Sequence, residues 1–435
     1  MMIAKLAVPL IISRLGEMVS SFLFLAFVGQ FIPDALGHAS FAWAFVSLLT
    51  VVGIGFFSIL MIEVAGAHGS NDSRVFELLN AALKLSVFMG FFVTASVFLY
   101  AVITANEFQG FYADSEKVLV LMSVSMPAIY LQIVVFNYFN ALGQPKFELI
   151  FVWFFNILIC FVSALLLIFV SELDVISFVA GYVGARWVLV MVVLGFLYIK
   201  TRKNSFGFIL FQAVPALEYK VFFFKGLPLA LCFGGESFLY FFFSVVSKNI
   251  GDLELSAYQA SLHFLSVIYM ISIGIGNATA ILTAKPYEQG KLSEFKGRCM
   301  EGMVFGVLLL IPCLFACMYF SDVVASMYSS DVDVNSLIAS YIVMAVPFLV
   351  FEYIYVVVRM VLRSLGDYWV PTIFTIVCLN ILGVISCWAL LNFYECSVRS
   401  IFMALVMCSF VLMVFLVWRL IGIIRNYSMG NNSTI

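Results

Sequence analysis

The sequence predicts an all-α polytopic membrane protein with twelve transmembrane helices, and three observations support this prediction. Hydrophobic residues make up 64% of the 435 residues and charged residues only 11%, whereas soluble domains average about 45–50% and about 25%. The apolar residues form runs long enough to cross a bilayer, which needs about 20 residues. The basic residues fall mainly in alternate gaps between these runs. The net charge of -2 says nothing about nucleic acid, and the lack of a basic tract predicts no nucleic-acid partner.

Each gap between the apolar runs carries turn-forming or charged residues. Gly66–Asp72 and Leu142–Pro145 are two such gaps, and their residue types favour turns. The predicted spans are residues 6–29, 41–64, 79–103, 118–140, 147–170, 175–199, 221–247, 257–283, 300–320, 337–362, 370–393 and 399–424.

The positive charges predict the orientation of the chain in the membrane. Gaps after even-numbered spans, the span ends next to them and the two chain ends hold sixteen of the 22 Lys and Arg residues, and the opposite side holds only Lys117, Lys248 and Arg399. Because basic residues stay on the cytoplasmic side, we expect both termini in the cytoplasm and a multi-pass protein of the plasma (inner) membrane. The basic stretch at residues 200–220 is interpreted as a cytoplasmic linker between an N-terminal lobe, residues 1–199, and a C-terminal lobe, residues 221–435.

The two predicted lobes repeat one another in sequence. Pro9 and Pro228 are 219 residues apart, and a glutamate follows each by eight residues, at Glu17 and Glu236. Further matches join 53–55 to 274–276, 142–143 to 365–366, and 156–158 to 380–382, at offsets of 221, 223 and 224. Since six spans separate the repeats, corresponding spans run in the same direction. A parallel repeat of this kind predicts two six-helix lobes around a central cavity, as in transporters.

Three glutamates lie well away from the ends of predicted spans: Glu17, Glu236 and Glu352. A charge near the bilayer centre costs roughly 2.5 kcal/mol or more, so such residues mark ion, proton or substrate sites. Eight helical residues rise roughly 12 Å, which puts Glu17 and Glu236 at matching depth in opposite lobes.

Several motifs resemble those of the MATE (multidrug and toxic compound extrusion) family over nearly the whole chain. The first span carries Leu6–Pro9 and ends in Phe27–Gly29, and the second ends in a Gly66-Ala67 turn. The more specific stretches are Gly226–Ala230 followed by Glu236, then Ser256–Ala260, then Leu362–Asp367, which is similar to the family's "LRGxGD".

The resemblance to the NorM-like branch of that family implies a function and a pair of site residues. It implies export of organic, often cationic, compounds driven by inward Na⁺ or H⁺, with a V-shaped pair of six-helix bundles and a cavity between them. It implies that Glu236 and Glu352 couple transport to the cation and hold Na⁺ if Na⁺ is that cation. Glu352 stands where the branch has an aspartate. Phe24 stands where the family commonly has a span-1 aspartate, and Ala284–Pro286 also departs from the pattern.

Other polar residues in the spans each have two interpretations. Arg359 is two turns from Glu352, and either neutralises a carboxylate or extends toward the membrane surface. Arg14 lies one turn from Glu17, and their pair is either structural or part of an N-lobe site. Further candidates for the site or cavity are Tyr240, Gln259, His263, Asn277, Tyr353 and Asn380. Such residues usually serve as packing or interhelical hydrogen-bond partners.

Competing functions are weaker fits to the sequence. A lipid-linked oligosaccharide flippase of the same wider superfamily would have a cationic cavity, whereas this site is led by carboxylates. An intramembrane enzyme would need a catalytic constellation, but the spans hold aspartate only at their edges and no HExxH motif occurs. We therefore expect a monomeric secondary antiporter and not an enzyme, with a small organic substrate, Na⁺ or H⁺ as coupling ion and no other cofactor. A non-transporting receptor is the remaining alternative.

Overall fold

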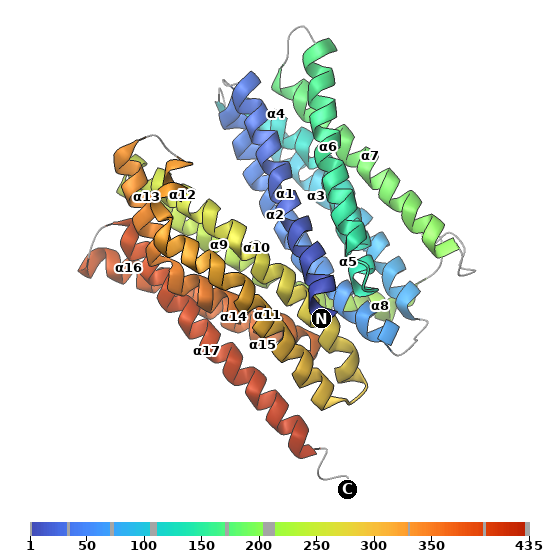
Figure 1. Ribbon diagram of the computed structural model, residues 1–435. Coiled ribbons are helices and arrows are strands. Elements are labelled where there is room, and N and C mark those ends of the chain that lie inside the picture. Colours follow the sequence, from blue (N-terminus) through green and yellow to red (C-terminus); the bar gives the residue numbers. More distant parts are fainter. Residues whose placement is uncertain are drawn as a thin grey trace. The chain divides into compact units, whose positions relative to one another are not determined.

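The computed structural model describes residues 2–32, 35–69, 74–104, 111–169, 174–202, 214–328, 331–394 and 397–430. All regular secondary structure within these ranges is helical (Figure 1). The first half contains α1 (Met2–Phe31), α2 (Leu36–Gly69), α3 (Arg74–Thr104), α4 (Phe111–Ser123), α5 (Met126–Ala141), α6 (Lys146–Phe169) and α7 (Val175–Arg202).

The second half of the chain is helical in the same way. It contains α8 (Ala216–Val221), the π-helix η3 (Phe222–Gly226), α9 (Leu227–Ile250), α10 (Asp252–Glu288), α11 (Leu292–Tyr319), α12 (Ser321–Ser326), α13 (Val332–Met344), α14 (Val346–Ser364), α15 (Trp369–Thr375), the π-helix η4 (Ile376–Leu382), α16 (Gly383–Phe393) and α17 (Val398–Gly430).

Within the described ranges, ten helical stretches are long and apolar enough to cross a membrane, and two bent helix pairs bring the number to twelve. The predicted all-α membrane fold is therefore confirmed. Several helices extend beyond the predicted spans. For example, α10 covers 252–288 where the sequence predicted 257–283. The extra turns carry polar residues such as Glu254 and Lys285, which hydropathy alone does not assign to a span.

The two bent pairs lie at equivalent places in the repeat. The α4–α5 pair bends by 41° and the α13–α14 pair by 46°. Pro127 and Pro347 stand at the start of the second helix of each pair, 220 residues apart (347 − 127). Proline lacks the amide proton and clashes with the preceding turn, which explains both bends.

The turns that follow α5 and α14 also match. Gly143 and Gly366 both have positive φ, 71° and 83°, a conformation that glycine adopts without steric cost. The amide of the next residue returns to the helix in each turn: Gln144 N donates to Phe139 O, and Asp367 N donates to Leu362 O. The repeat seen in the sequence at offset 223 is thus a repeat of backbone geometry.

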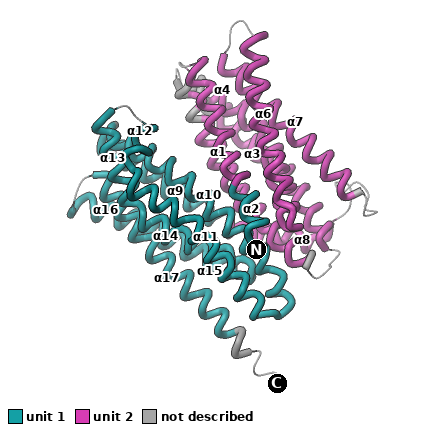
Figure 2. Tube along the Cα trace, in the orientation of Figure 1, with its two compact units in different colours: residues 1–11, 231–435 teal, residues 12–230 magenta. Residues whose placement is uncertain are grey.

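The chain forms two compact units whose boundaries fall inside helices (Figure 2). Unit 2 is Ile12–Ala230, and unit 1 combines Met1–Ile11 with Leu231–Ile435. The two crossing points, after residues 11 and 230, are 219 residues apart (230 − 11). The start of α1 therefore packs with the second half of the chain, and the segment leading into α9 packs with the first half.

Glycines in α2 and α10 allow these exchanged segments to approach closely. A Cβ on Gly55 would lie 2.7 Å from Leu229 O and 2.8 Å from Ala230 Cα, within unit 2. A Cβ on Gly274 would lie 3.0 Å from Ile11 N, within unit 1. These contacts align Gly55 with Gly274 at offset 219 (274 − 55). The predicted alignment of 53–55 with 274–276, at offset 221, is two residues out of register.

Ion pairs attach the segment that precedes α9 to unit 2. Lys225 Nζ lies 2.6 Å from Glu63 Oε1 at the end of α2. Arg74, at the start of α3, pairs with Glu218 of α8 at 2.8 Å and with Glu63 at 3.8 Å. These contacts bind the α8–η3 segment to α2 and α3.

Candidate functional site

In unit 1, a buried ion pair joins α9 to α14. Glu236 is 4% exposed. Arg359 Nη2 lies 2.9 Å from its Oε2, and the Tyr355 hydroxyl donates to its Oε1 at 2.8 Å. Tyr355 and Arg359 are one turn apart on α14, so both reach α9 from the same face. Arg359 had two interpretations, neutralisation of a carboxylate or extension toward the membrane surface, and its side chain contacts the carboxylate of Glu236.

Glu352 lies on the same helix but in a poorer hydrogen-bonding environment. Its side chain is 2% exposed. The Tyr240 hydroxyl of α9 approaches Oε1 at 3.4 Å, and Oε2 has no hydrogen-bond partner among the described residues. Glu236 and Tyr240 are one turn apart on α9, a rise of roughly 6 Å. Both predicted carboxylates therefore lie where α9 packs on α14. Glu352 contacts α9 at Tyr240, about one turn along α9 from Glu236.

A second arginine of α14 lies beside this cluster. Arg363 is fully buried, and its guanidinium lies 5.2 Å from the ring centre of Phe233, as Arg359 lies 5.6 Å from the same ring. Within the described part of the chain, Arg363 Nε and Nη2 have no partner, and Nη1 contacts only Met360 Sδ at 3.4 Å. The cluster thus holds two guanidinium groups and two carboxylates.

The other predicted residues of unit 1 are spread over several elements. Gln259 donates to Ser244 Oγ at 2.9 Å, and His263 Nδ1 lies 3.0 Å from the Tyr328 hydroxyl; both are exposed. Tyr353 is buried against α11, where its hydroxyl donates to Gly302 O and Met303 O. Asn277 is buried in α10.

Asn380 packs beside the α9 turn that carries Glu236. Its Nδ2 would lie 2.9 Å from a Cβ on Gly235. Neither polar atom of its amide has a partner in the described ranges. The equivalent pair of the first half is Gly16 and Asn156, where Asn156 Nδ2 donates to Gly16 O at 3.0 Å. The repeat offsets are 219 (235 − 16) and 224 (380 − 156).

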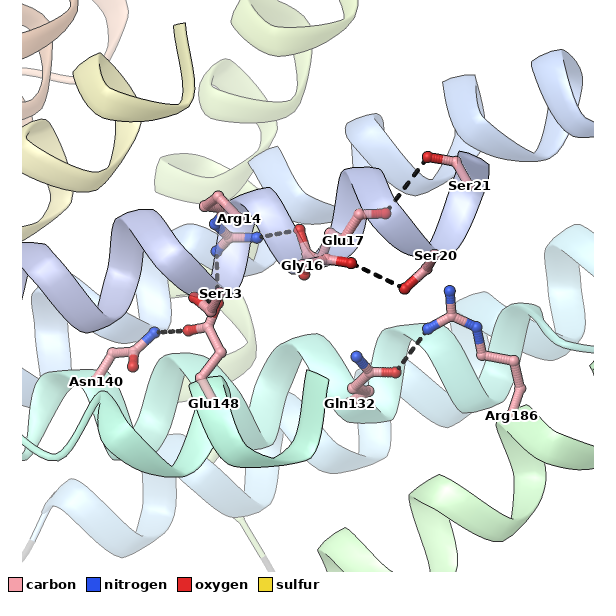
Figure 3. Close-up of polar contacts among 10 residues, drawn as sticks. All are labelled: Ser13, Arg14, Gly16, Glu17, Ser20, Ser21, Gln132, Asn140, Glu148 and Arg186. Carbon is pink, nitrogen blue, oxygen red and sulfur yellow. Dashed lines mark hydrogen bonds and ion pairs between the residues drawn. The ribbon is translucent and has the colours of Figure 1, made fainter. Parts of the chain in front are cut away.

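Unit 2 contains a second charged cluster, around Arg14 (Figure 3). Arg14 Nη1 lies 2.8 Å from Glu17 Oε2, and Nη2 lies 3.4 Å from Glu148 Oε1. Ser13 also donates to Glu148 Oε1, at 3.0 Å, and Asn140 Nδ2 donates to Oε2. Glu148 is fully buried. It was missed from the sequence because it follows Lys146 at the edge of a predicted span, where a solvated charge is the usual outcome.

Arg186 is held separately from these carboxylates. It donates to Gln132 Oε1 at 3.1 Å and to the Tyr182 hydroxyl at 2.8 Å, and it stacks 3.9 Å from the centre of the Phe155 ring. Gln132 is the repeat counterpart of Glu352, at offset 220 (352 − 132). Equivalent positions on α5 and α14 thus carry an amide in one unit and a carboxyl in the other.

Phe24, at the position of the family's span-1 aspartate, lies in an aromatic cluster. Its ring centre is 4.9 Å from that of Trp43, 4.9 Å from that of Tyr182 and 5.4 Å from that of Phe178. A fully buried phenylalanine in this setting has no proton to exchange, so the first helix carries its charge elsewhere, at Arg14 and Glu17.

Comparison with known proteins places the chain in a family. The sequence profile described as MatE matches residues 9–166 and 228–389, two segments that start 219 residues apart. The chain belongs to the MatE family. The predicted resemblance is confirmed, and membership of this transporter family places the protein outside the enzymes.

Curated MatE relatives are distant but extend along the chain. The chain is 23% identical over 432 residues to a probable multidrug resistance protein NorM of Caulobacter vibrioides, covering 95% of this chain and 90% of that protein. It is 24% identical over 241 residues to a NorM protein of Bacillus cereus, covering 54% and 52%.

Solved MATE structures share the fold. An outward-facing multidrug resistance MATE family transporter matches with a TM-score of 0.89 at 14% identity, over 98% of this chain and 96% of that chain. The eukaryotic MATE transporter AtDTX14 matches with a TM-score of 0.84 at 16% identity, over 98% and 97%. At this identity the likeness establishes the fold alone.

Proposed function

We propose that this MatE protein is a secondary antiporter that exports small organic compounds, cationic or amphipathic, in exchange for an inward cation by alternating access. Its family membership, and the names of its curated relatives, support export of such compounds. The buried carboxylates on α9 and α14 supply groups that a coupling cation would bind. The positive charges of the loops support an inner-membrane protein with both termini in the cytoplasm, and we treat it as a monomer.

One observation carries the ion-coupling proposal: Glu352 is buried, yet its Oε2 has no partner in the part of the chain that the structure describes. A buried carboxylate with one oxygen left without a hydrogen bond is costly to keep as an anion. A proton or a cation bound there removes that cost. Release of the ion restores the cost of burying the Glu352 anion. We therefore expect the occupancy of Glu352 and the conformational state of the protein to depend on each other.

The geometry favours H⁺ over Na⁺ as that ion. Hard metal cations need several oxygen ligands, but both oxygens of Glu236 are engaged by Tyr355 and Arg359. Glu352 alone needs only one proton, whereas Na⁺ would require Arg359 to move away from Glu236.

The test is transport in proteoliposomes under separately imposed H⁺ and Na⁺ gradients, with ethidium as the organic cation. We expect an H⁺ gradient to drive export, and Glu352→Gln to lower it at least about tenfold, because Gln is nearly the same size and cannot ionise. The matched control is Glu294→Gln on α11, whose side chain is 47% exposed. Wild-type rates in a well-folded Glu352→Gln variant would remove Glu352 from the coupling site, and export driven by Na⁺ alone would reverse the choice of ion.

A further inference from the structure

The cluster in unit 2 contains one more acidic group than basic groups. Arg14 lies between Glu17 and Glu148 and contacts both (Figure 3). With both carboxyls ionised, the three side chains carry a net charge of one negative unit. Among the described residues, the ion pairs of these three side chains are with one another only.

Within the described residues of α5 and α7, the polar side chains near the cluster are either uncharged or bound to other partners. From α5, Asn140 donates to Glu148, and Gln132 is directed to Arg186. From α7, Arg186 is bound to Gln132 and Tyr182 and stacks on Phe155. No described side chain of α5 or α7 therefore balances the surplus negative charge of the cluster.

Two buried polar atoms at the cluster lack partners in the described ranges: Asn140 Oδ1 and Arg14 Nε. Asn140 is 1% exposed, and its amide nitrogen donates to Glu148 Oε2. Rotation of this amide by half a turn would present Oδ1 to the same carboxyl oxygen. The amide can therefore donate to an ionised Glu148 and accept from a protonated one. After that rotation, the Oδ1 that now lacks a partner would accept a hydrogen bond from a protonated Glu148.

The cluster is more exposed at Glu17 than at Glu148. The Glu17 side chain is 35% exposed, while that of Glu148 is 0% exposed. Arg14 Nη1 lies 2.8 Å from Glu17 Oε2, whereas Nη2 lies 3.4 Å from Glu148 Oε1, so Arg14 is closer to Glu17. When a proton adds to the Glu17 carboxylate, the attraction that holds Arg14 there weakens, and Arg14 can close on Glu148. A shared counter-ion thus lets the two carboxyls hold a single proton between them.

We propose that Arg14, Glu17 and Glu148 form a proton-binding site in unit 2, which takes up one proton and becomes electrically neutral. The proton adds to a carboxylate oxygen, and no other covalent bond forms or breaks. This site is separate from Glu236 and Glu352 in unit 1 and does not depend on them. It uses residues of α1 and α6 other than Phe24, so an exchangeable proton remains in this unit despite the phenylalanine.

The test is infrared spectroscopy of the purified full-length protein in lipid nanodiscs, recorded as a function of pH. We expect the C=O stretching band of a protonated carboxyl, which titrates in the wild type, to be lost in both Glu17→Gln and Glu148→Gln. Loss in both single variants distinguishes a shared proton from two independent ones. Glu352→Gln should retain this band, so failure of the coupling proposal in unit 1 leaves this test unaffected. Glu294→Gln is the surface control.

A further variant separates proton binding from a structural role. Arg14→Gln leaves two carboxyls without their shared cation, which favours protonation, so the band should persist at pH values where the wild type has lost it. A purely structural cluster would lose stability without such a change. Where Glu148→Gln fails to fold, Glu17→Gln and Arg14→Gln still decide the question. An unchanged titrating band in both of these variants would overturn the proposal.

Discussion

The two equivalent glutamates are each neutralised by an arginine, but the arginine comes from a different helix in each unit. Glu17 pairs with Arg14 of its own helix, whereas Glu236 pairs with Arg359 of α14. The counterpart of Arg14 in the second half is Phe233, at offset 219 (233 − 14), and Arg359 lies over that ring. A buried carboxylate needs an oppositely charged partner. In unit 2 that partner lies on the same helix, and in unit 1 it lies on the neighbouring helix.

Removal of Arg359 should therefore expose the cost of burying Glu236. We expect Arg359→Gln to lower the free energy of unfolding by about 3–5 kcal/mol, because one buried charge is left without its partner. The double variant Arg359→Gln/Glu236→Gln should recover at least half of that loss. Reversible unfolding in detergent measures both values. Additive losses in the double variant would show that the pair is not coupled.

The sequence predicted some of these contacts and not others, for a physical reason. Arg14 and Glu17 are three residues apart on one helix, so their pairing follows from helical spacing alone. Glu236 and Arg359 are 123 residues apart, and their contact depends on how two helices are aligned lengthwise. Asn140 and Glu148 flank a turn, and sequence alone does not show that this turn points its polar groups inward.

At the scale of helices, two glycines of α11 determine how closely α10 and α14 can each approach α11. A Cβ on Gly306 would collide with the Tyr353 hydroxyl, and one on Gly302 would collide with Thr279. The same tyrosine hydroxyl donates to Gly302 O at 2.9 Å. Small residues that allow close helix approach are a main device of packing in membranes. This packing role accounts for the buried position of Tyr353.

Gly306→Ala should accordingly destabilise the protein by about 1–3 kcal/mol, the usual cost of overpacking. The matched control is Gly297→Ala on the same helix, where no atom of the described residues lies within 4 Å of the added Cβ. That variant should be neutral or gain up to about 1 kcal/mol, because alanine favours helix. Thermal unfolding in one detergent compares the two. Equal losses in both would mean that helix propensity, and not the Tyr353 contact, determines the effect.

The bends of the span pairs were more accessible from sequence than these contacts. Proline within an apolar run favours a bend because it removes a backbone hydrogen bond, and Pro127 and Pro347 each begin the second helix of a bent pair. Pro312, by contrast, lies inside the continuous helix α11. The π-helices η3 and η4 were not predicted, since a single extra residue in a turn leaves no clear pattern in an apolar sequence.

At the scale of the whole molecule, the spans and their repeat were predictable from the sequence. The compact unit to which the first residues of α1 and α9 belong was not. Hydropathy identifies a span without indicating which neighbours each end packs against. The predicted lobes divide at residues 200–220, whereas the compact units divide within α1 and α9. The predicted lobes therefore remain a prediction about which parts of the chain move together. The boundary between the compact units, after residue 230, lies ten residues beyond the end of the predicted linker.

If the exchanged helix ends move during transport, the glycines beside them should matter more for activity than for stability. We expect Gly55→Ala and Gly274→Ala each to slow export at least about tenfold, because the added methyl meets backbone atoms that cannot move aside. Gly184→Ala in unit 2 and Gly422→Ala in unit 1 are controls, with no described atom within 4 Å of the new Cβ. Export rate and thermal stability are measured together. Normal export by both test variants would show that these contacts are not part of the cycle.

The exchanged helix ends also bear on how such a chain arose. Residues 2–11 pack with the second half, and the residues leading up to Ala230 pack with the first half, at equivalent points of the repeat. In a half-length ancestor, before duplication and fusion, the same arrangement would have required the N-terminal segment of each polypeptide to pack with a second copy. Such a precursor would have been an obligate domain-swapped homodimer, with no complete fold as a single copy. Fusion then converted an exchange between two molecules into a connection within one.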